Sequence, residues 1–303
     1  MNSLVSILCL AWLQTCLAAD FPVEFRLYTR QNWNTYQVVS RTSRSSLTGS
    51  NFNKFKDTKF ITHGYTESAS TSSWMTKMKD ELLTYANYNV FLVDWEKGAD
   101  EVRYDLSADN ADECGEEIYQ FVAFLKSTLS YSESRVHLIG FSLGAQASGS
   151  AGKRLPTIAR ISGLDPAGPG FDTYGNDKKL DSSDAQFVDI IHVDGNTVGG
   201  AGCWYPSGHV DFYPNGGQGQ PACQSSKRDV SAYGNLGCDH MMAPEYYIES
   251  INVNCDFKAY PCEHGEACYS CRGRCNRMGF HAKTSPTGVF YLETNSRSNY
   301  CQN

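Results

Sequence analysis

The sequence lacks three features, and each absence narrows what the protein can be. It has no run of basic residues, and 26 Lys and Arg against 33 Asp and Glu give a formal net charge of -7, so we do not expect nucleic acid as a partner. No Asn-x-Ser/Thr sequon is present, so N-glycosylation is not expected. After residue 19, no apolar run reaches the roughly 20 residues that a membrane-spanning helix needs. The composition is that of a folded protein, with 41% hydrophobic and 19% charged residues.

The first 19 residues, MNSLVSILCLAWLQTCLAA, carry no charged side chain and form a short apolar run that ends in small residues. This pattern is typical of a secretory signal peptide, although the usual positive charge near the start is missing. We expect cleavage near Ala18 or Ala19 and a secreted, extracellular product. No Ser-rich or Pro-rich linker and no internal repeat divides the remainder, so we expect residues 20–303 to form a single domain.

The cysteines favour disulfides. Ten of the 12 lie after the first 19 residues, and an even number in a secreted chain is typical of disulfide pairing. The spacing Cys268-x2-Cys271-x3-Cys275, with His264 nearby, would also suit zinc, but an oxidising compartment favours disulfides over free thiols. Most of these cysteines lie where Gly and Pro become frequent, after residue 195, so we expect disulfides to hold the C-terminal part together.

Short β-rich runs alternate with helical patterns through most of the chain. The runs are residues 59–63, 90–95, 136–141, 160–165 and 188–193. Between the second and the third, apolar residues recur at the spacing of one helix face: Ile118, Phe121, Val122, Leu125 and Leu129. Asn110 or Asp112 could cap this helix. The alternation predicts an α/β fold with a mostly parallel central sheet and helices on both faces.

A G-x-S-x-G motif spans Gly140 to Gly144, where the third β-rich run ends. Small residues follow it and suit a helix that packs closely on a sheet. In such a strand–turn–helix setting, a sharp turn presents the serine hydroxyl at the sheet edge, and flanking glycines avoid Cβ clashes. The motif alone also fits an ordinary Gly/Ser turn, but its context predicts that Ser142 is a nucleophile.

A serine nucleophile needs a histidine base and a carboxylate that orients it. Asp165 ends the next β-rich run, at the edge of a parallel sheet where site residues gather; an Asp before Pro166 can also simply form a turn. Among the later histidines, His192 lies inside a β-rich run and is expected in the core. His240 follows Cys238 and Asp239 at the start of a predicted helix. Local chemistry therefore favours His240 as the base without establishing it.

Two backbone N–H groups could bind a developing oxyanion. The residue after the nucleophile, Leu143, supplies one, and a loop after an earlier strand supplies the other. His63-Gly64-Tyr65 ends the first β-rich run, and Gly64 lets the chain approach closely. The sequence therefore predicts the amides of Tyr65 and Leu143 as donors.

Seven sequence blocks resemble, in order, the secreted animal lipase family that includes pancreatic lipases and arthropod phospholipases of type A1. The blocks are ITHGYTES, VDWEKGA, VHLIGFSLGAQASG, ISGLDPAGPGF, LDSSDAQFVDIIHVDG, GHVDFYPNGG and CDHMMAPEYYIES. The resemblance extends over nearly all of residues 20–301. It implies an α/β-hydrolase fold, a Ser142–His240–Asp165 triad, an oxyanion hole made by the amides of Tyr65 and Leu143, and no cofactor.

The resemblance also shows departures. The sequence ends where the catalytic domain of longer vertebrate lipases ends, which implies that colipase is not a partner. A lid bounded by a Cys223–Cys238 disulfide would hold 14 residues, fewer than in triglyceride lipases of the family and closer to the phospholipases; a solvated surface loop is the alternative. Asp181 and Asp184 match carboxylates near a calcium ion in the family, but Asn176 replaces a nearby acidic residue, so metal binding stays open.

We therefore expect a secreted serine hydrolase that cleaves glycerolipid esters at a lipid surface and contacts membranes only peripherally. Phospholipase A1 activity on the sn-1 ester is the leading prediction. The alternatives are a triglyceride lipase with a short lid and a non-catalytic lipid-binding relative, like the lipase-like yolk proteins of some insects that lack the nucleophile.

Overall fold

The computed structural model describes residues 21–195, 199–224, 237–252 and 254–302. The expected signal peptide and most of the expected lid lie outside the described residues. The strands are β1 (Glu24–Tyr28), β2 (Gln37–Val38), β3 (Thr58–Thr62), β4 (Asn89–Asp94), β5 (Val136–Phe141), β6 (Arg160–Leu164), β7 (Val188–Ile191), β8 (Val210–Pro214), β9 (Lys258–Pro261), β10 (Asn276–Arg277) and β11 (Gly288–Leu292).

These strands form one 11-stranded sheet in the order β10-β9-β11-β8-β7-β6-β5-β3-β4-β1-β2. The strands from β11 to β4 run parallel to their neighbours, and the pairs at the two ends of the sheet are antiparallel. All five predicted strands are present as β3 to β7, with ends shifted by up to about two residues. His63, Asp165 and His192 consequently lie just beyond the strands, at their carboxyl ends.

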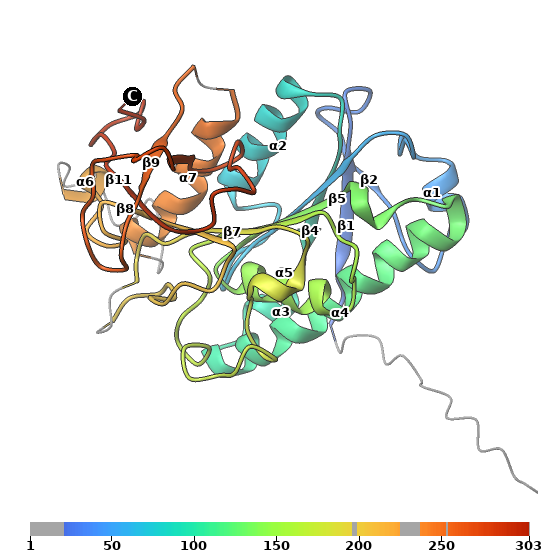
Figure 1. The fold of residues 1–303 in the computed structure, drawn as a ribbon. Helices are drawn as coiled ribbons and strands as arrows, with labels where there is room; N and C mark the ends of the chain where they lie inside the picture. Colours follow the sequence, from blue (N-terminus) through green and yellow to red (C-terminus); the bar gives the residue numbers. More distant parts are fainter. Residues whose placement is uncertain (1–20, 196–198, 225–236, 253, 303) are drawn as a thin grey trace, which may run out of the picture.

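Helices cover both faces of the sheet (Figure 1). Helices α2 (Ser73–Tyr85) and α7 (Cys238–Asn252) pack together on one face, and α3 (Glu96–Ala99), α4 (Tyr104–Leu129) and α5 (Leu143–Lys153) lie on the other. Two short helices, α1 (Arg44–Thr48) and α6 (Pro221–Gln224), lie outside these layers.

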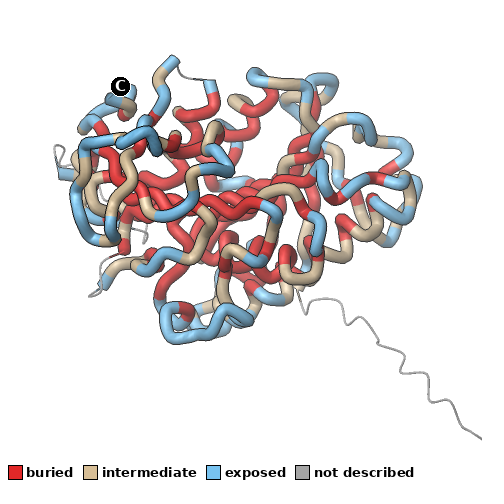
Figure 2. Tube along the Cα trace, in the orientation of Figure 1, coloured by how far each residue is buried: buried red, intermediate tan, exposed pale blue. Residues whose placement is uncertain are grey.

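Neighbouring residues of the central strands pack into two different hydrophobic cores, one on each face of the sheet. On β3, Phe60 packs into the core that includes α4, and Ile61 into the core that includes α2 and α7. Leu138 and Ile139 divide in the same way on β5, as the two-residue period of a strand requires. The sheet is therefore buried from both sides (Figure 2), which explains its continuous apolar runs. The predicted α/β-hydrolase fold is confirmed.

The predicted start of the long helix is wrong. Helix α4 begins at Tyr104, so Asn110 and Asp112 lie within it and do not cap it. Asn110 instead donates to the carbonyl of Gly98. The buried Ser107 belongs to an additional first part of the helix, which the sequence pattern did not predict because its residues are mostly polar. Among the described residues, no helix combines the length and the apolarity needed to cross a bilayer.

Four disulfides stabilise the C-terminal part, as predicted: Cys223–Cys238, Cys255–Cys301, Cys262–Cys268 and Cys271–Cys275. The pairing removes the thiols that the zinc alternative required. The other two of the ten cysteines, Cys114 and Cys203, are unpaired and buried, so the even number did not mean complete pairing.

Candidate active site

Ser142 occupies the turn between β5 and α5, with φ 55° and ψ -122°. A non-glycine residue at positive φ is strained, and such turns are a feature of exposed nucleophiles. The close packing that the sequence predicts is present: a Cβ at Gly144 would lie 2.4 Å from the carbonyl oxygens of Thr62 and His63. The approach of α5 to the end of β3 therefore requires glycine at this position.

Asp165 follows β6, the strand next to β5, and also has a positive φ, of 44°. The two turns are hydrogen bonded to each other. The Ser142 amide donates to the carbonyl of Leu164 (3.1 Å), and the Ala167 amide donates to the carbonyl of Ser142 (3.2 Å). Adjacent parallel strands thus bring Ser142 and Asp165 to the same edge of the sheet.

His240 reaches this edge from the first turn of α7. Its Nδ1 lies 2.6 Å from Oδ2 of Asp165, and both side chains are fully buried. The imidazole also packs on the Phe141 ring, with centroids 4.5 Å apart, and Phe141 directly precedes Ser142. The structure therefore pairs His240 with Asp165 and places the imidazole against the residue that precedes Ser142.

The second ring nitrogen of His240 is buried and has no hydrogen-bond partner in the described part of the chain. With Nδ1 donating to the carboxylate, Nε2 is an acceptor. In this structure no hydrogen bond joins it to Ser142 Oγ, and such contacts are often long before substrate binds. A buried acceptor left unpaired is a group that can receive a proton.

The other Asp165 oxygen, Oδ1, accepts the amide of Val193 at 2.8 Å and that of Asp194 at 3.4 Å. Burial raises the pKa of Asp194 and of Asp239 above the usual range, backbone donors oppose this shift, and the charge of Asp165 adds to it. Oδ1 of Asp165 is thus held by two backbone donors, while Oδ2 faces His240.

The turn after β3 lies against Ser142. A Cβ at Gly64 would be 3.3 Å from Ser142 Oγ. The Gly64 amide donates to Glu67 (2.9 Å), and the Thr66 amide donates to the carbonyl of Ala99 (2.9 Å). The hydrogen bonds found among the described residues use neither the Tyr65 nor the Leu143 amide, so both amides are available to a ligand.

Glu67 supports this turn and was not singled out by the sequence. Its carboxylate accepts hydrogen bonds from the Gly64 amide, the Ser72 hydroxyl and the Trp74 indole. Its position three residues after Gly64 was the available signal, because a carboxylate at that spacing can accept an N–H of its own turn.

His192 has the predicted structural role. It is fully buried, its Nε2 lies 2.9 Å from Asp211, its Nδ1 contacts the carbonyl of Cys203, and its ring stacks on Tyr213. Both ring nitrogens are occupied, so His192 offers no free base.

Asp181 and Asp184 face a cation that the protein itself supplies. Lys153 Nζ lies 2.8 Å from both Asp184 oxygens and 3.8 Å from Asp181, and it also donates to the carbonyl of Lys179. The ammonium group takes the position that a metal ion would need between these carboxylates. The residues as placed do not fit calcium.

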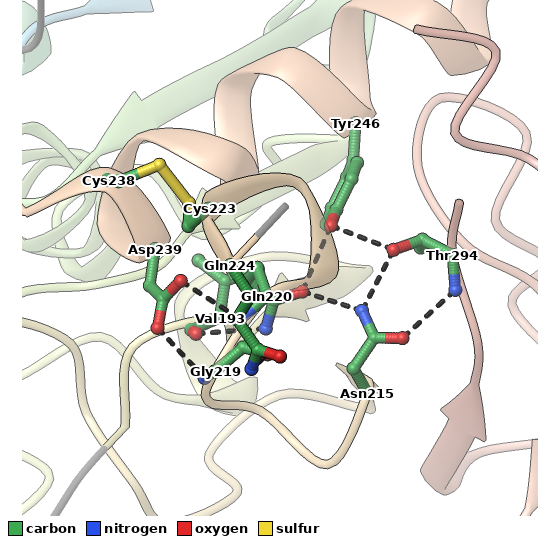
Figure 3. Close-up of a disulfide and its surroundings, with 10 residues drawn as sticks. All are labelled: Val193, Asn215, Gly219, Gln220, Cys223, Gln224, Cys238, Asp239, Tyr246 and Thr294. Atoms are coloured by element: carbon green, nitrogen blue, oxygen red, sulfur yellow. Dashed lines mark hydrogen bonds between the residues drawn. A yellow bond between two sulfur atoms is a disulfide. The ribbon is translucent and has the colours of Figure 1, made fainter. Parts of the chain in front are cut away.

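The Cys223–Cys238 disulfide joins α6 to the first residue of α7, two residues before His240 (Figure 3). Residues 225–236, which make up most of the expected lid, lie outside the described residues.

The sheet order and the serine, histidine and aspartate at its edge define the α/β-hydrolase class. Within that class, the chain belongs to the Lipase family, whose model matches residues 13–300. This confirms the predicted pancreatic lipase-like family.

Curated relatives match most of this chain. Pancreatic lipase-related protein 2 of Cavia porcellus is 37% identical over 91% of this chain and 65% of its own length. Human pancreatic triacylglycerol lipase is 38% identical over 93% and 66%, and human inactive pancreatic lipase-related protein 1 is 35% identical over 92% and 64%. The chain thus spans just under two thirds of the length of these relatives.

Among solved structures, the Pyrococcus furiosus esterase Pf2001 matches with a TM-score of 0.36 and 17% identity, over 59% of this chain and 73% of that one. A similarity this distant carries no argument about function.

Proposed function

We propose that the protein is a secreted serine hydrolase of glycerolipid esters, with Ser142, His240 and Asp165 as its catalytic triad. The observation that carries the proposal is the buried 2.6 Å contact between His240 and Asp165, with Nε2 unpaired and the imidazole packed on Phe141, the residue before Ser142. Family membership alone would not suffice, because one similar human relative is named inactive.

In the first half-reaction, Ser142 Oγ attacks the ester carbonyl while His240 Nε2 accepts the hydroxyl proton. The Asp165 carboxylate accepts the hydrogen bond of the Nδ1–H group and stabilises the imidazolium. The tetrahedral oxyanion accepts hydrogen bonds from the Tyr65 and Leu143 amides. When the C–O bond breaks, His240 gives its proton to the departing alkoxide, and the acyl group stays on Ser142.

In the second half-reaction, water replaces the alcohol. His240 takes a proton from the water as its oxygen attacks the acyl carbonyl, and a second tetrahedral oxyanion occupies the same amides. His240 then returns the proton to Ser142 Oγ, and the fatty acid leaves. The cycle needs no cofactor.

The finer proposal is phospholipase A1 activity, cleavage of the sn-1 ester. Its support is the resemblance in the sequence: a lid between Cys223 and Cys238 is short, and a short lid leaves a site open to a charged headgroup. Triglyceride hydrolysis is the second candidate, because similar relatives from human and Sus scrofa are named pancreatic triacylglycerol lipases. In both cases the enzyme contacts the lipid surface peripherally. Four disulfides support secretion.

Covalent labelling by an organophosphate ester tests the triad. Wild type should be labelled, and Ser142→Ala should not. Ser148→Ala is the matched control, because Ser148 lies on α5 and its hydroxyl donates to the carbonyl of Gly144 within that helix segment; it should be labelled like wild type. Folded wild-type protein that takes no label would support a non-catalytic lipid-binding protein.

Product analysis decides between the two substrates. A phosphatidylcholine with different acyl chains at its two positions and a triglyceride emulsion are offered to the same preparation. Release of the sn-1 fatty acid supports phospholipase A1. Negligible phospholipid turnover with rapid triglyceride hydrolysis would replace it by the triglyceride lipase.

A further inference from the structure

Gln220 lies next to the triad and is fully buried. All hydrogen-bonding groups of its side-chain amide are used. Its Nε2 donates to the carbonyls of Val193 (3.0 Å) and Pro214 (3.1 Å). Its Oε1 accepts from Asn215 Nδ2 (2.7 Å) and from the Tyr246 hydroxyl (3.0 Å) (Figure 3). A buried amide satisfied on every side has one orientation only.

The backbone of Gln220 is tied to the helix that carries His240. Its amide donates to Oδ1 of Asp239 at 2.9 Å, and the Gly219 amide donates to Oδ2 at 2.8 Å (Figure 3). Three residues further on, the Cys223–Cys238 disulfide makes a covalent link between the same two segments. The start of α7 is therefore fixed to residues 219–223 on both sides of Gln220.

Together with the triad contacts, these bonds close a ring. Oδ1 of Asp165 accepts the Val193 amide, and the Val193 carbonyl accepts Nε2 of Gln220. The backbone amide of Gln220 donates to Asp239. Nδ1 of the next residue, His240, lies 2.6 Å from Oδ2 of Asp165, which completes the ring. One residue, Val193, thus connects the carboxylate of the triad to Gln220.

We propose that Gln220 is a positioning residue that fixes the distance and angle between Asp165 and His240. The inference rests on the proposed function, since it assigns a role in the same triad. Gln220 acts through its neighbours and touches no substrate. Its loss should therefore lower kcat and leave KM unchanged. A misplacement of catalytic groups of about 1 Å can cost on the order of 100-fold in rate.

The test compares Gln220→Met with wild type by kcat, KM and the pH dependence of kcat/KM. Methionine has a similar volume but no donor for the Val193 carbonyl. We expect kcat to fall roughly 10-fold to 100-fold. A looser Asp165 contact stabilises the imidazolium less, so the acidic limb of the kcat/KM profile should move to lower pH. The low-field proton NMR signal of His240 Nδ1–H should weaken.

Two controls separate positioning from a loss of stability. Gln224→Met changes the same residue type four positions later, where Nε2 donates, within the described part of the chain, only to the Gly219 carbonyl, and should behave like wild type. Tyr246→Phe removes a buried hydroxyl that donates to Gln220 Oε1, outside the ring. It should lower Tm but leave the pH profile in place.

Gln220→Glu keeps the acceptor for Asn215 and Tyr246 and, when protonated, one donor, so its kcat should fall between wild type and Gln220→Met. If the Met variant does not fold, the Glu variant decides. A wild-type kcat and acidic limb in either folded variant would overturn the positioning role. Wild type that neither hydrolyses lipid nor takes the organophosphate label would instead overturn the proposed function.

Discussion

A Cβ atom at Gly64 would lie 2.7 Å from the Cβ of Ser142, closer than two such carbons approach in proteins. Gly64→Ala must therefore move the turn after β3 away from the nucleophile, and the Tyr65 amide moves with it. Because loss of one oxyanion donor typically costs about 100-fold to 1000-fold in rate, we expect kcat to fall by that order. Hydrolysis rates of folded protein, with Tm measured in parallel, check this.

The matched control for this variant is Gly175→Ala. Within 3 Å of a Cβ at Gly175 lies only the side chain of Asp177, which is exposed and can rotate. This variant should retain wild-type kcat. An equal loss of activity in both variants would mean that the close approach to Ser142 is not the cause.

Asp165→Asn tests the tautomer of His240. Since Oδ1 accepts two backbone amides, the new amide nitrogen must face Nδ1 and donate to it. The imidazole then carries its proton on Nε2 and cannot accept one from Ser142, so kcat should fall roughly 10⁴-fold at neutral pH with little change in KM. Steady-state kinetics on the folded variant measure this.

The chain supplies a second buried Asp–His pair as the control. Asp211 lies 2.9 Å from Nε2 of His192, and neither residue belongs to the proposed triad. Asp211→Asn should lower Tm but keep kcat within a few-fold of wild type. A large loss of kcat in this variant would mean that the loss in Asp165→Asn cannot be assigned to the tautomer of His240.

Arg160 and Asp189 form a buried bidentate ion pair across β6 and β7, with nitrogen–oxygen distances of 2.7 and 2.9 Å. Arg160 also donates to the carbonyls of Phe280 and Gly279. Asp189→Ala leaves this guanidinium buried without its counter-ion, so the free energy of unfolding should fall by about 3–5 kcal/mol. Asp256→Ala, at an exposed pair with Arg277, should cost at most about 1 kcal/mol. Urea unfolding of both variants decides, and equal losses would contradict the prediction.

The sequence predicts what short-range patterns encode. The G-x-S-x-G motif and the strand before it locate Ser142, because the turn requires small residues at fixed spacing. Asp165 follows from its place at the end of the next strand. His240 could only be favoured, since its partner lies 75 residues away in the chain and no local pattern records that contact.

Long-range polar contacts explain the failures. Gln220 lies in a Gly-rich stretch that suggests a loop, and its role depends on Val193, 27 residues earlier. The start of α4 was missed because Ser107 is a polar residue on a buried face, which interrupts the apolar period. Cys114 and Cys203 are both unpaired, so an even number of cysteines does not show that every thiol lies next to a partner.

Lys59 on β3 places a charge in an apolar environment. Its Nζ lies 4.6 Å from the centre of the Tyr88 ring and 5.5 Å from that of Phe280. Burial is the main cause that lowers the pKa of Lys59 to about 8, and the Arg160 charge adds to the shift, with Asp57 opposing it. In the unfolded chain this lysine returns to 10.5, so the unfolded state binds more protons between these two values.

The free energy of unfolding must therefore rise with pH over this window. The contribution of Lys59 to stability is fully present above its unfolded pKa of 10.5, and it is lost as pH falls through about 8. We expect the free energy of unfolding of wild type, relative to Lys59→Met, to increase between about pH 7.5 and pH 10. Tyr88 does not interfere, because burial raises its pKa to about 12. Urea unfolding at both pH values measures the difference, with Lys54→Met at an exposed position as the control. Parallel pH curves for wild type and Lys59→Met would mean that Lys59 titrates alike in the folded and unfolded chain.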